Sequence, residues 1–168
     1  MQPNPRDAAR HLLHSMQYRP PLNIKSLVRD HNIEIINTTV ERTVRGMLAF
    51  GDPRAMIMIN SWYDKSQQRF SLAHLFGHFI LHKDIGPFLV DSATHDEKNS
   101  SQTRRRQEQD ANEFATELLM PEEILRERFA KRPPYVYSSN VVQPLSVQFG
   151  VSELVFALRL SQLGLTNP

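Results

Sequence analysis

The chain has 168 residues, the size of one compact domain with a small appendage. Hydrophobic residues make up 40% and charged residues 23%, a balance that supports a globular core and excludes an intrinsically disordered chain. There are no cysteines, so disulfides, thiolate catalysis and cysteine-ligated zinc are excluded together. The net charge is only +2 and the one dense basic cluster is residues 104–106, which argues against a broad nucleic-acid-binding face.

The sequence shows no targeting or membrane segment. Its first residues, Met1 to Arg6, lack the apolar stretch of a signal peptide, and no apolar run reaches the length that spans a bilayer. We therefore expect a cytoplasmic protein without a membrane-spanning part.

The first third of the chain predicts two helices and then a small sheet. Apolar residues recur at helical spacing over residues 6–17 and 22–29, with Pro20 and Pro21 between the two helices. Segments rich in β-branched or apolar residues then predict three strands, at 33–36, 44–50 and 55–59. The turn signal Gly51-Asp52-Pro53 joins the last two strands as a hairpin.

The rest of the chain predicts helices. Asp64, with Gln67 three residues later, forms a capping-box pattern at the start of a helix that continues to Leu81. A polar loop is expected from Asp91 to Thr103, a helix over 104–119, and two short helices between 141 and 165. The fold class is therefore α+β and mostly helical, with a three-stranded sheet. We expect a domain over residues 1–130 and a helical extension over 131–168 that packs on it.

His74 and His78 are the first candidates for metal ligands. They are four residues apart on the predicted helix, so both imidazoles project from one face toward a common point. Gly77, beside the second histidine, permits the close approach of another chain segment. A zinc site needs a third protein ligand, which must be His, Asp or Glu because cysteine is absent.

The downstream helix offers that third ligand. Glu108 shares one helical face with Ala111 and Ala115, whose small side chains allow close packing against the histidine helix. Asp110 lies about 200° further round the helix, which makes it the second choice. His95, in the predicted loop, is a further alternative ligand. We expect His82 to be a hydrogen-bonded structural histidine.

Two motifs resemble those of the ImmA/IrrE metallopeptidase family. The segment RFSLAHLFGHFILH, residues 69–82, is similar to the family signature R-F-x-L-A-H-E-L-G-H-x-x-L-H, and EQDANEFATELLMP, residues 108–121, is similar to E-x-x-A-N-x-F-A-x-E-L-L-M-P. The segment from Phe149 to Gly164 also resembles the family's closing helices. This resemblance implies a zincin-like core over 1–130, a helix-turn-helix-like extension over 131–168, and His74, His78 and Glu108 as zinc ligands.

The resemblance also implies a function. Proteins of this family cut helix-turn-helix repressors in stress responses or during the induction of mobile elements. The implied partner is therefore a protein, such as a repressor of the XRE type or an antitoxin. The family is a hydrolase family, so the resemblance alone implies a zinc peptidase.

The sequence departs from the family signature at Leu75. In a His-Glu-x-x-His enzyme the glutamate takes a proton from zinc-bound water, and leucine has no group that accepts one. We therefore expect a pseudoenzyme with an impaired catalytic site. Three carboxylates of the predicted loop are possible substitutes for the base: Asp91, Asp96 and Glu97.

Two further binding hypotheses come from other segments. The strand Ala55, Met56, Ile57, Met58 and Ile59 is expected beside the histidine helix, where an exposed edge would bind an extended peptide by strand addition; alternatively it only fills the core. The last helices resemble a helix-turn-helix, which makes DNA binding the other alternative. The polar side chains Arg159, Ser161 and Gln162 lie among so many apolar ones that we expect burial of this face rather than base contacts.

Overall fold

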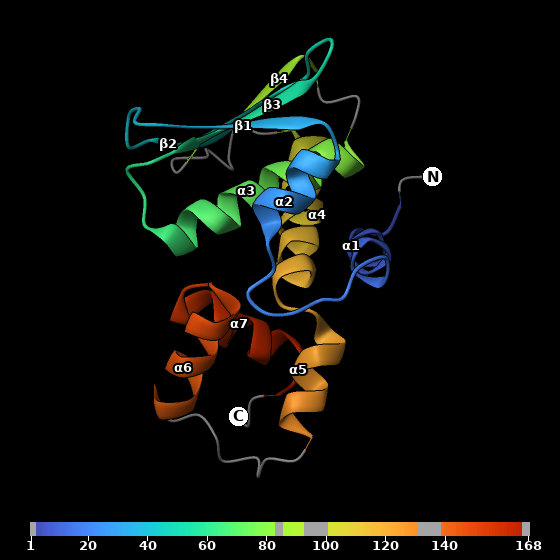
Figure 1. Cartoon of the computed structure of the whole chain (residues 1–168), viewed down its shortest axis with the longest axis vertical. Coiled ribbons are helices and arrows are strands. Elements are labelled where there is room, and N and C mark those ends of the chain that lie inside the picture. Colours follow the sequence, from blue (N-terminus) through green and yellow to red (C-terminus); the bar gives the residue numbers. More distant parts are fainter. Residues whose placement is uncertain (1–2, 83–85, 93–100, 131–138, 166–168) are drawn as a thin grey trace.

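The computed structural model describes residues 3–82, 86–92, 101–130 and 139–165. Its elements, in chain order, are α1 (Pro5–His14), α2 (Ile24–Asp30), β1 (Ile33–Thr38), β2 (Val44–Ala49), β3 (Ala55–Asn60), α3 (Lys65–Leu81), β4 (Phe88–Ser92), α4 (Gln102–Leu119), α5 (Glu122–Phe129), α6 (Ser139–Phe149) and α7 (Glu153–Gln162). The sheet forms a layer at one end of the molecule, with α3 and α4 next to it and α5, α6 and α7 at the opposite end (Figure 1). The α+β class and the helical excess are confirmed.

The sheet has four strands in the order β1-β3-β2-β4. The hairpin predicted from Gly51-Asp52-Pro53 is present, because β2 and β3 are antiparallel, whereas β1 runs parallel to β3. The prediction of three strands missed β4, which pairs with β2. This short strand ends in Asp91 and Ser92, two polar residues at the place where the sequence predicted the start of a loop.

The predicted peptide-binding strand does not lie at an edge of the sheet. The strand formed by Ala55, Met56, Ile57, Met58 and Ile59 is the first five residues of β3, which is hydrogen-bonded to β1 on one side and to β2 on the other. Both of its main-chain edges are therefore occupied, so it cannot accept a further strand. The strand-addition hypothesis is wrong for this segment. Ile57 and Ile59 fill the core instead.

Helix α3 lies against the inner face of this sheet. The capping box predicted for its first turn is present: the Asp64 carboxylate accepts a hydrogen bond from the Gln67 amide at 2.9 Å, and the Gln67 side chain accepts one from the Asp64 amide at 3.2 Å. The buried Leu72 and Leu75 belong to the same core cluster as Ile57 and Ile59 of β3. The helix is thus held by its cap and by its apolar face.

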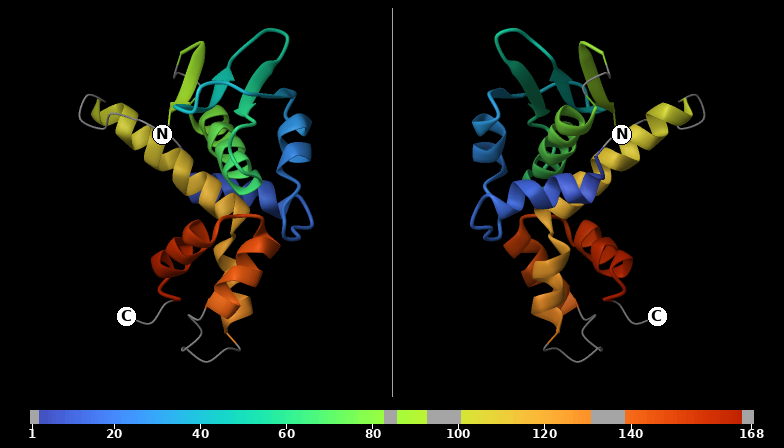
Figure 2. Two further views of the ribbon diagram at one scale, coloured as in Figure 1. Left: turned by 90° about the vertical axis from the view of Figure 1, so that its left-hand side faces the viewer. Right: turned by 90° about the vertical axis from the view of Figure 1, so that its right-hand side faces the viewer.

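Helix α4 crosses α3 at a point where the facing side chains of both helices are small. A Cβ atom added at Gly77 would lie 3.2 Å from the Ala111 carbonyl oxygen and 2.9 Å from the Phe114 ring. The missing side chain at Gly77 and the methyl group at Ala111 therefore permit the close approach that the sequence predicted. In two side views α4 runs from the sheet end toward the C-terminal helices (Figure 2).

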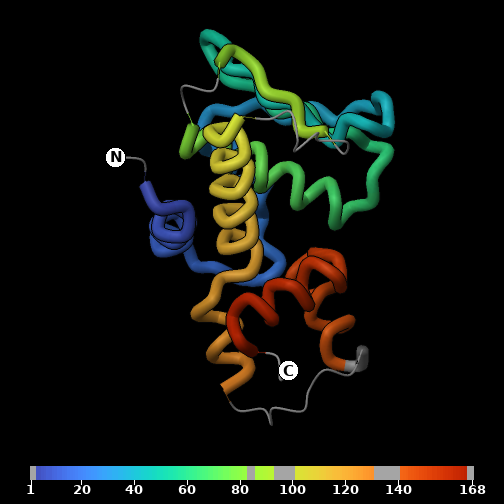
Figure 3. The backbone as a smooth tube through the Cα atoms, turned by 180° about the vertical axis from the view of Figure 1, so that it is seen from behind, coloured from blue at the N-terminus to red at the C-terminus, as the bar shows by residue number. Residues whose placement is uncertain are grey.

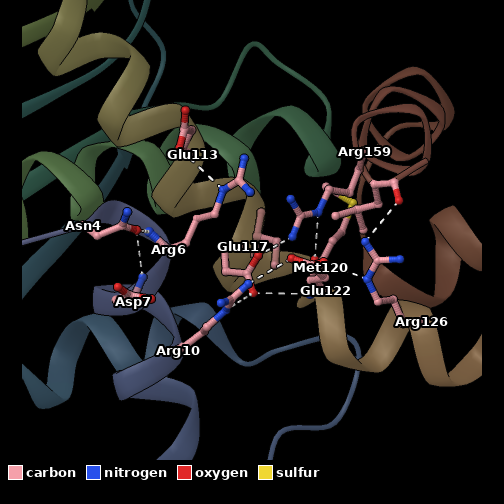
Figure 4. A network of polar contacts seen from close by, with 12 residues as sticks. Asn4, Arg6, Asp7, Arg10, Glu113, Glu117, Met120, Glu122, Arg126 and Arg159 are labelled. Atoms are coloured by element: carbon pink, nitrogen blue, oxygen red, sulfur yellow. Dashed lines mark hydrogen bonds and ion pairs between the residues drawn. The ribbon is translucent and has the colours of Figure 1, made fainter. Parts of the chain in front are cut away.

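The C-terminal helices are tied to the rest of the fold by buried charges (Figure 4). Arg159 of α7 and Glu117 of α4 are 2% and 1% exposed and form an ion pair. Arg10 of α1 binds the same carboxylate at 2.9 Å, and Arg159 also donates to the Met120 carbonyl at 3.2 Å. Apolar residues on both sides of residue 131 share one core cluster, among them Phe156. The backbone traced from behind shows α7 beside the junction of α4 and α5 (Figure 3).

Among the described residues no single helix has both the length and the apolar character needed to cross a bilayer. Only α6 and α7 taken together pass that test, and they are bent by 101° relative to each other.

Candidate metal centre

Three side chains from two helices converge at the centre of the molecule. Nε2 of His74 and Nε2 of His78, both on α3, lie 3.1 Å apart. From α4, Glu108 brings one carboxylate oxygen to 3.3 Å from Nε2 of His74 and the other to 3.5 Å from Nε2 of His78. The three residues form a group whose candidate ligand atoms all lie within 4.8 Å of one another. The sequence predicted this convergence from the helical spacing and the alanine face of α4.

These distances fit a tetrahedral metal ion. An ion with bonds of about 2.05 Å to nitrogen and oxygen separates its ligand atoms by about 3.3 Å. The two imidazole nitrogens are 3.1 Å apart, and each lies 3.3 or 3.5 Å from a different oxygen of the Glu108 carboxylate. The two imidazoles and the carboxylate are therefore close enough together to bind one ion, with room for small adjustments of the carboxylate.

The hydrogen bonds around the histidines supply the right protonation state. Nδ1 of His74 lies 3.0 Å from the carbonyl oxygen of Asn112, which can only accept, so Nδ1 donates and Nε2 keeps its lone pair. Burial lowers the pKa of His78 to about 4, so its ring is neutral at pH 7. Burial would raise the pKa of Glu108, but the two imidazoles next to its carboxylate outweigh burial and hold the pKa well below its usual range.

Lone pairs and a carboxylate that face one another need a cation between them. With Nε2 of His74 unprotonated and Glu108 ionised, the group offers acceptors at short distances. Within the described residues, the only cationic side chain in contact with these acceptors is Arg104, which binds one oxygen of Glu108 at 3.0 Å. Arg104 lies one helical turn before Glu108 on α4. The donor set therefore has the chemistry of a metal site.

Leu75 follows His74 in the sequence, but its side chain points toward β2 of the sheet. Its side chain is fully buried, and its Cδ1 atom would be 2.7 Å from a Cβ atom added at Gly46 of β2. Leu75 thus packs under the sheet in space that the glycine leaves open. Across the sheet Gly46 pairs with Asp91 of β4, so the apolar side chain ends close to the β4 edge.

A cleft of about 540 Å³ opens beside the three converging residues. His74, Glu108 and Asn112 lie on its wall, whereas Leu75 does not. The other walls come from the first turns of α3, from β4 and from the start of α7, with the apolar Val90 on the strand. The remaining lining residues are mainly polar or aliphatic, among them Arg45, Tyr63, Ser66, Gln67, Asp91, Ser92, Ser152, Leu154 and Val155. This mixed lining differs from the mainly apolar walls that are typical of small-molecule pockets.

The alternative site residues lie in other places. Asp110 approaches His82 instead of His74 or His78, with 3.7 Å between its carboxylate oxygen and Nε2 of His82. Asp91 is 8% exposed, is bound by Arg45 at 3.3 Å and lines the cleft. The candidates His95, Asp96 and Glu97 lie outside the described residues.

A family comparison identifies the chain. The family model of the IrrE N-terminal-like domain, peptidase family M78, matches residues 28–161, most of the chain. The chain belongs to this ImmA/IrrE metallopeptidase family. It is also similar to the metallopeptidase ImmA of Bacillus subtilis (strain 168), with 28% identity over 119 residues that make up 71% of this chain and 64% of that protein. The chain therefore matches less than two thirds of that relative's length.

A solved structure supports the fold. A transcriptional regulator of Mycobacterium tuberculosis superposes with a TM-score of 0.63 at 18% identity, covering 94% of this chain and 46% of that chain. This likeness concerns the fold alone. The family match and the three converging side chains together indicate a metal site in an ImmA/IrrE-type chain.

Several residues of this ImmA/IrrE centre were missed from the sequence. Asn112 orients His74, and its position four residues after Glu108, on the same helical face, was a usable signal. The contribution of α7 to the cleft had no signal in the sequence, because nothing local relates Ser152 to His74. The same holds for β4, whose position beside β2 depends on pairing across the sheet.

Proposed function

We propose that this chain is a zinc-binding protein of the ImmA/IrrE type that is strongly impaired in peptide hydrolysis and recognises a regulatory protein in its cleft. The observation that carries the proposal is the convergence of His74, His78 and Glu108 beside a leucine at position 75. The ligand set supports metal binding, and Leu75 removes the expected proton acceptor.

Zinc is the metal that this set of ligands favours. Two imidazoles and one carboxylate, with an open fourth position, are the protein ligands of many catalytic zinc sites. Zinc bound there would lower the pKa of a bound water molecule toward 7. The chain's own contribution is to hold the ring of His78 neutral and the carboxylate of Glu108 ionised, as their pKa values indicate.

Impaired hydrolysis follows from the missing base. A positioned acid–base group typically contributes about 10²–10⁴-fold to a reaction rate. Leu75 cannot accept a proton, and Glu108 is engaged with both histidines and with Arg104. Binding of a substrate-like polypeptide does not need the base, because position 75 is not among the residues that line the cleft.

The proposed partner is a helix-turn-helix repressor of the XRE type or an antitoxin. Membership in the ImmA/IrrE family supports a regulatory protein as partner, and the size and mixed polarity of the cleft support a polypeptide segment as its ligand. DNA is a weaker candidate, because Arg159, a potential base contact, is buried against Glu117.

Metal analysis tests the first half of the proposal. Protein purified without added zinc is expected to contain about one zinc per chain, and His74→Ala and Glu108→Ala are expected to lose it. His14→Ala, which removes an exposed histidine of α1, is the matched control and should keep the metal. Wild-type protein without zinc that also fails to bind it in titration, or full zinc retention in both site variants, would contradict the proposal.

Binding and cleavage assays test the second half. The repressor or antitoxin encoded beside this chain is mixed with the zinc-loaded protein; a complex should form, and the partner should remain intact over hours. If the partner neither binds nor is cleaved, the proposed recognition of this partner is refuted. Rapid cleavage that a chelator stops refutes the impairment.

One observation favours a second candidate function, an active zinc peptidase with a substitute base. Asp91 is a nearly buried carboxylate on the wall of the cleft that also includes His74 and Glu108. Its ion pair with Arg45 at 3.3 Å fixes its position. If chelator-sensitive cleavage is found, Asp91→Asn should abolish it, whereas Asp52→Asn in the β2–β3 turn should not.

A further inference from the structure

A third histidine continues the row on α3 and has no role in the proposed zinc coordination. His82 is 2% exposed, and its Nδ1 atom lies 3.1 Å from Nδ1 of His78. Its Nε2 atom is the one buried side-chain nitrogen or oxygen in the described part of the chain without a hydrogen-bond partner. The nearest acidic group to it is Asp110, with a carboxylate oxygen at 3.7 Å. A buried imidazole in this position requires an explanation.

The contact between the two Nδ1 atoms holds one proton, and the position of that proton decides whether His78 can bind a metal. If Nδ1 of His78 carries the proton and donates it, Nε2 of His78 keeps its lone pair toward Glu108 and His74. If His82 donates instead, the proton of neutral His78 sits on Nε2. It then points at the place of the metal and blocks it.

Asp110 favours the arrangement that binds metal. When His82 accepts through Nδ1, its own proton is on Nε2, on the side of Asp110. The carboxylate is 21% exposed and needs to move by only about 0.7 Å to reach hydrogen-bond distance. A carboxylate attracts an N–H and repels a lone pair, so it stabilises this tautomer of His82 and, through it, the donating Nδ1 of His78.

We propose that His82 and Asp110 form a relay, the His82–Asp110 relay, that positions the metal ligand His78 and fixes its tautomer. The proposal rests on the proposed binding of zinc by His78. His74 has a simpler partner, because Asn112 accepts directly from its Nδ1 atom. Each ligand histidine thus has an acceptor on its far nitrogen. For His74 the acceptor is Asn112 of α4, and for His78 it is His82, the C-cap residue of α3, which faces Asp110 of α4. Partners of this kind typically change metal affinity by about 10–100-fold.

The test compares variants that keep or remove the acceptor at position 82. His82→Phe keeps the ring volume but accepts no hydrogen bond, so zinc affinity measured by competition with a chromogenic chelator should fall about 10–100-fold. His82→Asn places its carbonyl oxygen near the former Nδ1 atom and should stay within a few-fold of wild type. Asp110→Leu should also weaken binding, whereas Glu127→Gln, which removes an exposed charge on α5, should not.

Two further readouts separate positioning from folding. Thermal unfolding in the presence of EDTA reports the stability of each variant without metal, and a loss of zinc affinity counts only where the variant is folded. Nitrogen-15 NMR of the imidazoles in the zinc-loaded wild type should show the proton of His78 on Nδ1 and that of His82 on Nε2. Should the folded His82→Phe protein bind zinc as tightly as wild type, or should the NMR show the opposite tautomers, the relay is refuted. Wild-type protein that binds no zinc refutes the relay and the proposed function together.

Discussion

Replacing Leu75 by glutamate tests the missing base directly. If the absence of this base limits hydrolysis, Leu75→Glu should raise the rate of partner cleavage by about 10²–10⁴-fold, which corresponds to about 2.7–5.4 kcal/mol of activation free energy. The side chain at position 75 packs against Gly46, whose strand partner Asp91 lies on the cleft wall, so a glutamate there has to turn toward the cleft to act as the base.

The same substitution should weaken the fold. Leu75 is fully buried, and removing its burial costs about 1.5–3 kcal/mol, to which the burial of a polar group adds about 1–3 kcal/mol. For a chain of 168 residues, each kcal/mol lowers the melting temperature by about 2–4 °C. A drop of roughly 5–24 °C is therefore expected. The glutamine side chain has nearly the same shape as glutamate, so Leu75→Gln should lose a similar amount of stability.

The glutamine variant is therefore the control for the rate measurement. Both variants are loaded with zinc, their metal content is measured, and cleavage of the partner is followed at a temperature where both are folded. Only the glutamate accepts a proton, so only Leu75→Glu should gain activity. Equal rates in two folded, zinc-loaded variants would refute the argument that the lost base is what silences this chain.

Three further perturbations probe the packing that supports the site. Arg159→Met removes one of the positive charges that bind the buried carboxylate of Glu117, so it should lower the free energy of unfolding in urea by about 2–4 kcal/mol. Arg126→Met removes an exposed ion pair and should cost less than about 1 kcal/mol. Equal effects of the two variants would contradict the argument that burial makes the Arg159–Glu117 pair important. Gly77→Ala would stabilise an isolated helix by about 1 kcal/mol, but the added Cβ atom would lie against the backbone of α4. We therefore expect lower stability and weaker zinc binding in chelator competition. A variant that is more stable and binds zinc as tightly as wild type would show that α3 and α4 are not in close contact. Asp64→Ala should cost about 1 kcal/mol in urea unfolding. A serine hydroxyl and first-turn amides lower the pKa of Asp64, so its stabilisation is present above about pH 3.9 and is lost as pH falls through the folded pKa; Asp64→Asn should keep the cap and lose this pH dependence.

The sequence was most informative where neighbours along the chain decide the outcome. The cap at Asp64 and the spacing of His74 and His78 depend on residues within one or two helical turns, and both features are present. Glu108 was found because its helical face also carries two alanines, and such a face indicates close packing on another helix. The leucine at position 75 and the absence of cysteine are read from the sequence without any structure.

The tertiary structure alone decided which of these segments meet. The apolar strand Ala55–Ile59 resembles an edge strand as much as a central one, since strand order depends on pairing between segments far apart in the chain. The approach of Asp110 to His82 and the place of α7 beside the cleft likewise result from packing between helices that are distant in sequence. Local signals thus determined the ligand types and their spacing. Long-range packing determined their orienting partners, and with them the shape of the cleft.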